Sequence, residues 1–77
     1  MVICHLKSIL GVLGKEQKDI AYILNISRNT VSNFALNKTY PDIVQAYEIV
    51  TIINKWANEK GINYTWDIYS IWEQKNN

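Results

Sequence analysis

The chain has 77 residues, of which 48% are hydrophobic, and it carries a formal net charge of only +1. This length allows one small domain, and the composition is too apolar for a disordered tail. No apolar run approaches the ~20 residues of a membrane-spanning helix, and the start of the chain lacks the basic leader and cleavage site of a signal peptide. We therefore expect a single-domain, soluble, cytoplasmic protein.

One cysteine and one histidine occur, adjacent to each other as Cys4 and His5. They cannot form a disulfide within the chain, and they do not make up a set of metal ligands. We expect Cys4 to be a packing residue and His5 to face solvent. The sequence also lacks paired carboxylates, a nucleophile with its base and a phosphate-binding loop. We therefore predict no enzymatic activity, no metal and no cofactor.

The small net charge hides an asymmetry along the chain. Residues 1–41 carry five Lys or Arg against two Asp or Glu, a net charge of +3. Residues 42–77 carry three Lys or Arg against five Asp or Glu, a net charge of −2. A basic front half and an acidic back half suggest that one face of the molecule meets an anion.

The first helix is predicted over about residues 4–13, where four apolar residues recur at i, i+3, i+4 and i+7. Gly14 can end this helix in the left-handed conformation that suits glycine. The opening segment, MVIC, is compatible with an extended chain but is not predicted to be a strand.

Two short helices are predicted next, over about residues 17–24 and 28–36. Asn25 stands where a chain leaving a helix needs a positive φ, and Ser27 is a good N-cap for the following helix. So short a connection forces a sharp angle between the two helices. The predicted core residues of this pair are Ile20, Ala21, Ile26, Val31 and Phe34.

The other face of the third predicted helix is polar but carries only one charge. Lys and Glu are the ordinary residues of a solvated helix face. Arg can donate two hydrogen bonds to guanine, and Asn can pair in the same way with adenine. A polar face with one cation therefore suits the reading of bases. Its four residues are Arg28, Asn29, Ser32 and Asn33.

A longer fourth helix is predicted over about residues 43–60, followed by a last helix over about 66–74. Asn37 is expected to end the third helix with a positive φ, and Thr65 to cap the last one. Apolar residues trace two neighbouring stripes along the fourth helix, which can wrap the core. Five helices and no strand make the predicted fold a compact all-α domain.

The stretch from Gly14 to Pro41 reads GKEQKDIAYILNISRNTVSNFALNKTYP. It resembles the helix-turn-helix of the Cro/phage-repressor type, the xenobiotic-response-element family of transcriptional regulators. That family has a Gln at the start of helix two, an aliphatic-Ala pair, a turn residue, an aliphatic-Ser pair before helix three and another within it, and a closing Pro. The same offsets hold here without a gap, at Gln17, Ile20, Ala21, Asn25, Ile26, Ser27, Val31, Ser32, Phe34, Asn37, Lys38 and Pro41.

The chain departs from the family pattern at several positions. Lys15 and Glu16 replace an aliphatic residue and an N-capping Thr or Ser, so we expect a weaker cap at the start of the second helix. Asn25 and Asn37 replace glycines, which is physically tolerable. The segment NKWANEKGINYT is longer than its counterpart in the family, and this difference can alter how two copies pair.

The resemblance implies a sequence-specific DNA-binding transcriptional regulator, most simply a repressor of phage, prophage or bacterial origin, whose helix 28–36 enters the major groove. The N-terminal part of such a helix reaches the base edges, so Arg28, Asn29, Ser32 and Asn33 are the expected base contacts. Phosphate contacts position the protein on the duplex. They are expected from Gln17, Lys18, Thr30, Lys38, Thr39 and Tyr40.

We expect a homodimer on a palindromic DNA operator, since one such domain makes few phosphate contacts. Trp is enriched at interfaces, so the dimer interface is expected at Trp56, Trp66 and Trp72. A second reading stays open, in which the same frame is a protein-interaction module, an antirepressor or co-repressor, that binds another regulatory protein. The low net charge and the aromatic, acidic last third of the chain favour this alternative.

Overall fold

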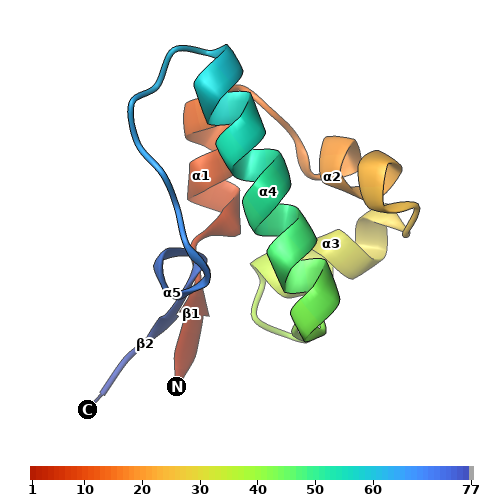
Figure 1. Ribbon diagram of the computed structural model, residues 1–77. Coiled ribbons are helices and arrows are strands. Elements are labelled where there is room, and N and C mark those ends of the chain that lie inside the picture. The colour runs from red at the N-terminus through yellow and green to blue at the C-terminus, as the bar shows by residue number, and fades with distance from the viewer. Residues whose placement is uncertain (77) are drawn as a thin grey trace.

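The structure, a computed structural model, describes residues 1–76. Figure 1 shows α1 beside α4, with α2 and α3 on one side of them and α5 with the two strands on the other. The described residues are thus mostly helical, with five helices that overlap the predicted ranges, and a small sheet is added to them. In chain order the elements are β1 (Val2–Cys4), α1 (Leu6–Leu13), α2 (Gln17–Leu24), α3 (Arg28–Ala35), α4 (Ile43–Glu59), α5 (Ile68–Ile71) and β2 (Trp72–Gln74).

The sheet joins the two ends of the described chain and corrects the all-α prediction. β1 and β2 are antiparallel, with Val2 opposite Gln74 and Cys4 opposite Trp72. Consequently α1 begins at Leu6 rather than near residue 4, and the last helix ends before Trp72 rather than near residue 74. The strand pairing depends on a partner at the far end of the chain, so local periodicity could not reveal it.

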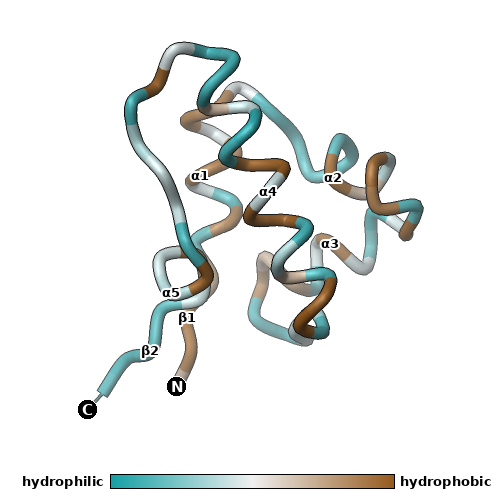
Figure 2. Tube along the Cα trace, in the orientation of Figure 1, coloured by the Kyte–Doolittle hydropathy of each residue, from teal (hydrophilic) through white to brown (hydrophobic). Residues whose placement is uncertain are grey.

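The core is one cluster of apolar side chains, to which every helix contributes. α1 buries the predicted face at i, i+3, i+4 and i+7. α4 buries a narrower stripe than its sequence suggests, Ala46, Ile49, Ile53 and Ala57. In Figure 2, apolar residues recur along α1 and α4, whereas the segment between α4 and α5 is mostly hydrophilic. The six large side chains with the least exposure are Leu6, Ile20, Val31, Ile49, Ile53 and Ile71.

The predicted helix ends are confirmed where a left-handed residue was expected. Gly14, Asn25 and Asn37 have φ of 68°, 56° and 62°. The start of α2 is better capped than expected, because the backbone N–H of Glu16 donates to the carboxylate of Asp19 at 2.8 Å, part of a capping box.

The last helix is shorter than predicted and has a different cap. Asp67, not Thr65, precedes it, and the Asp67 carboxylate accepts from the backbone N–H of Ser70 at 2.8 Å. The Ser70 hydroxyl also donates to this carboxylate, at 2.9 Å, and the two bonds hold the pKa of Asp67 below its usual range. Among residues 1–76, no helix combines the length and the apolar character that crossing a membrane requires.

Candidate nucleic-acid interface

α2 and α3 pack against each other, and a short turn connects them. Asn25 ends α2 in the left-handed conformation, and the N–H of Ile26 then donates to the carbonyl of Ala21 at 3.0 Å. Ser27 caps α3 as predicted, because its hydroxyl accepts from the N–H of Thr30 at 3.0 Å. The predicted core residues of the pair are buried, except that Ile26 is half-buried. The turn therefore holds the first turn of α3 in a fixed position beside α2.

The N-terminal turns of α2 and α3 together line a shallow hollow of about 440 Å³. Arg28 and Asn29 are exposed on its α3 side, and Ser32 is half-buried one turn later. The hollow therefore unites three predicted base-contact residues with two predicted phosphate contacts from α2. Its lining residues are Glu16, Gln17, Lys18, Arg28, Asn29 and Ser32.

Asn33 lies apart from this hollow. Its side chain is half-buried, and its carbonyl accepts from the N–H groups of Lys38 and Thr39 at 2.9 and 3.3 Å. Asn33 therefore helps to shape the loop that follows α3. The prediction that it faces outward is only partly met, because its side chain is half-buried.

The charges around the hollow are mixed. Lys18 Nζ lies 3.3 Å from a carboxylate oxygen of Glu16, and both side chains are more than half exposed. Arg28 forms no ion pair within residues 1–76, so its guanidinium is free to meet an external acceptor. The N–H groups at the start of α2 add partial positive charge, which favours an anion near Gln17.

The other predicted phosphate contacts occupy two places. Thr30 is half-buried, and its hydroxyl lies 2.8 Å from that of Ser27, so it is already engaged in the cap. Lys38, Thr39 and Tyr40 are exposed in the loop between α3 and α4. The predicted phosphate contacts thus flank α3 at both ends, with Gln17 and Lys18 near its start and the loop residues after its end.

Glu16 is the lining residue that sequence reasoning missed as a site residue. Its position three residues before Asp19 is the spacing of a capping box, and this spacing could have placed it at the start of α2. Glu16 pairs with Lys18, so it reduces the positive charge that Lys18 presents at the hollow.

The three tryptophans pack against the core of the chain itself. Trp56, Trp66 and Trp72 are all half-buried. Lys15 Nζ lies 5.0 Å from the centre of the Trp56 ring, and the Trp66 backbone forms two hydrogen bonds with the Asn54 side chain. Only part of each indole is left for a partner, and the interface predicted at these residues remains a prediction.

Cys4 and His5 lie away from the hollow, at the sheet. Cys4 is buried as predicted, and burial raises the pKa of its thiol. His5 does not simply face solvent, because its Nε2 lies 2.8 Å from a carboxylate oxygen of Glu73. In the part of the chain that the structure describes, no three His, Cys, Asp or Glu residues are grouped as metal ligands would be.

No protein-family model matches the chain, and comparisons with curated proteins and with solved structures also find no match. A function for the hollow therefore has to be argued from its own residues.

Proposed function

We propose that the protein is a sequence-specific DNA-binding transcriptional regulator that uses α2 and α3 as a helix-turn-helix. The observation that carries this proposal is the single hollow that unites Arg28, Asn29 and Ser32 of α3 with Gln17 and Lys18 of α2. Directional donors and acceptors lie on α3, where bases would be read, and groups suited to phosphate lie beside them.

The dimensions of α3 suit the major groove. An α-helix with its side chains is roughly 10–12 Å in diameter, and the major groove is ~12 Å wide. One side of α3 is held in the core by Val31 and Phe34, which are buried. Its first turn, with Arg28 and Asn29, is exposed and can approach base edges.

The backbone of the duplex would be met on both sides of α3. Gln17, at the start of α2, offers its amide and a helix N-terminus to one phosphate strand. Lys38 and Thr39, both exposed in the loop after α3, suit the other strand. In this arrangement phosphate contacts set the orientation and α3 selects the sequence.

The regulator would act as a homodimer that covers an operator, most simply as a repressor of phage, prophage or bacterial origin in the cytoplasm. Two copies read half-sites about one turn, ~34 Å, apart. The principal extents of one molecule, 35 × 28 × 21 Å, are of the same order as this separation.

Two observations favour a second function, that of an antirepressor or co-repressor that binds another regulator. The net charge is low for a DNA-binding domain, and several large apolar side chains of α4 are exposed. In this alternative α2 and α3 serve as a scaffold and DNA is not the partner.

Selection of bound sequences from a random DNA pool with the purified chain tests the proposal. We expect enrichment of a palindrome, and we expect Arg28→Ala to relax the selected base at one position of each half-site. Lys55→Ala, which removes an exposed cation of α4, is the control and should select the same sequence as the wild type. A folded wild-type protein that enriches no sequence would overturn the DNA-binding proposal.

A further inference from the structure

The N-terminal half of α4 presents a broad apolar surface to solvent. Val44, Tyr47 and Thr51 are exposed at i, i+3 and i+7, the spacing of one helix face. Beyond them the same face becomes polar, at Lys55 and Asn58. The apolar surface is thus confined to the half of α4 that follows the loop from α3.

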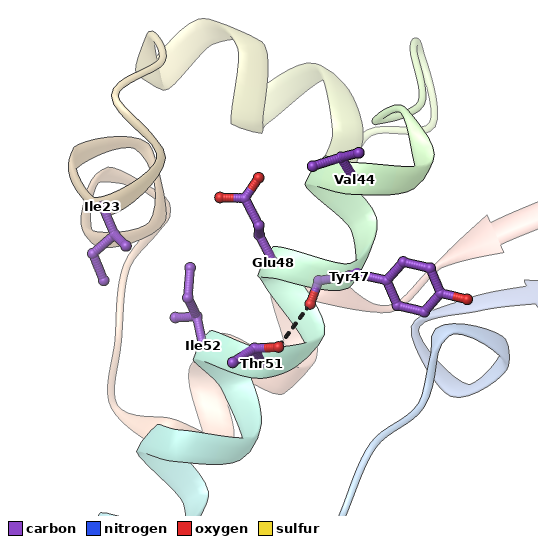
Figure 3. Close-up of a pocket in the computed structure, with 6 residues that line it drawn as sticks. All are labelled: Ile23, Val44, Tyr47, Glu48, Thr51 and Ile52. Carbon is purple, nitrogen blue, oxygen red and sulfur yellow. Dashed lines mark hydrogen bonds between the residues drawn. The ribbon is translucent and has the colours of Figure 1, made fainter.

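Figure 3 shows how this surface is hollowed on one side. Ile23 of α2 faces Ile52 of α4 across an open space, Glu48 lies on that side, and Tyr47 points the other way. The hydroxyl of Thr51 donates to the Tyr47 carbonyl at 3.0 Å, so its polar group is turned back onto the helix. This hollow measures about 440 Å³.

The surface continues on the side to which Tyr47 points. Tyr47 also lines a second hollow, together with Ile43 and Tyr69, and the latter two line a third with Tyr40. Because neighbouring hollows share lining residues, they form one continuous surface. We name it the α4 patch, and its exposed apolar residues are Ile23, Tyr40, Ile43, Val44, Tyr47 and Tyr69.

We infer that the α4 patch is the surface through which two copies of this chain associate. Each of its six apolar residues is more than half exposed. A tyrosine has about 150–250 Å² to bury, so the six together offer several hundred Å². This is at least comparable to the largest apolar patch of a typical monomer, about 300–600 Å² and often functional, and it approaches the ~800 Å² per partner of a standard stable interface.

Charge and position argue for a second copy rather than nucleic acid as the occupant. The ionised residues that line the three hollows are Glu48 and Asp67, both acidic, so a phosphate backbone would be repelled there. The patch begins at the loop that follows α3. Arg28 lies at the opposite end of α3 from this loop and is exposed, so an interface at the patch leaves Arg28 of each copy free.

This inference rests on the proposed function, which requires two α3 helices on one operator, and it assigns the interface to α4 rather than to the tryptophans. In a two-fold interface the same surface meets itself. Tyr47, at the middle of the exposed stripe, would lie nearest to the axis.

Sedimentation equilibrium of the whole chain without DNA tests the assignment, because the chain offers a matched pair of variants. The test variant carries Val44→Gln and Tyr47→Gln, at residues 63% and 59% exposed. The control carries Val12→Gln and Tyr22→Gln, at residues 60% and 88% exposed on α1 and α2. We expect a dimer whose dissociation constant rises at least ~10-fold in the test variant and stays within ~2-fold in the control.

A wild-type chain that stays monomeric at every concentration would overturn the inference and leave the patch to a different protein. An equal effect of both variants, or an effect of neither, would also overturn it.

Crosslinking gives a second measurement that leaves the apolar residues in place. Glu48→Cys puts a thiol at the edge of the patch, and Ser8→Cys puts one on exposed α1. Cys4 is buried and the pKa of its thiol is raised, so it reacts slowly. A short bis-maleimide should link the Glu48→Cys chains into dimers and leave the Ser8→Cys chains single. The reverse pattern would remove the α4 patch as the interface.

The two proposals fail in different ways. If the chain is a dimer that enriches no DNA sequence, the proposed interface stands and the DNA-binding proposal fails. If the chain is a monomer that enriches a single half-site, the proposed interface fails and the DNA-binding proposal stands.

Discussion

The backbone N–H of Cys4 donates a 3.0 Å hydrogen bond to the side-chain oxygen of Asn37, 33 residues further along the chain. Asn37 also has a φ of 62° at the end of α3. Asn37 therefore ends α3, the proposed recognition helix, and its side chain links the end of α3 to β1 by a hydrogen bond. Glycine would provide the positive φ but not the hydrogen bond, which gives a physical reason for asparagine at this position.

Asn37→Gly should lower the free energy of unfolding by about 1–3 kcal/mol, because the N–H of the buried Cys4 loses its acceptor. Asn25→Gly is a matched control, since Asn25 also has a positive φ and its side chain forms no hydrogen bond within residues 1–76. The control should change stability by only ~0.5 kcal/mol. Chemical denaturation measures both, and equal losses would show that the bond to Cys4 is unimportant.

The presence of the helices, and the helix ends that lie at left-handed residues, were predictable because their signals are local. Gly14, Asn25 and Asn37 stand at the left-handed ends, and Ser27 stands at the cap of α3. The positions of Arg28 and its neighbours on the outer side of α3 follow from the same periodicity. The part of the candidate site that α3 contributes could therefore be predicted from the sequence.

The sheet could not be predicted, because each strand has three residues and pairs with a segment at the other end of the chain. Trp72 accordingly lies in β2 rather than in the last helix. The exposure of Val44 and Tyr47 is also a tertiary result, since the core covers Ala46, Ile49, Ile53 and Ala57 on the adjacent side of α4. Apolar periodicity shows which residues of a helix can be buried but not which of them the rest of the chain covers.

The ion pair between His5 and Glu73 predicts a pH dependence. The hydrogen bond from His5, followed by the charge of Lys75, holds the pKa of Glu73 below its ordinary value of 4.5. The folded state therefore binds fewer protons than the unfolded state in this range. The stabilisation is fully present above pH 4.5 and is lost as the pH falls through the lower folded pKa.

Urea denaturation at several pH values from about 6 down to about 3 measures this effect. Glu73→Gln should lose less stability on acidification than the wild type. Glu59→Gln, at an exposed residue of α4, should keep the wild-type pH dependence. Parallel curves for wild type and Glu73→Gln would show that the pair with His5 does not stabilise the fold.

Arg28→Ala should weaken binding to the selected operator by ~1–3 kcal/mol and relax the preference at one base pair, while binding to unrelated duplexes changes little. Arg28 is exposed and forms no ion pair within the described residues, so its removal should leave the fold intact. Lys55→Ala, at the opposite half of α4 from the α4 patch, serves as the control. Titration of each variant with both duplexes gives the comparison, and an unchanged preference for the operator would remove Arg28 as a base contact.

Lys38 should behave differently from Arg28, because a phosphate contact carries no sequence information. Lys38→Ala is expected to weaken binding to the operator and to unrelated duplexes alike. It should also reduce the slope of log K against log salt concentration by about 1, since one fewer counterion is released. Binding measured over a series of salt concentrations gives this slope for the wild type, for Lys38→Ala and for the Lys55→Ala control. If Lys38→Ala keeps the wild-type slope, the exposed loop after α3 does not contact the duplex. Phosphate contacts would then be expected only from the α2 side of the hollow.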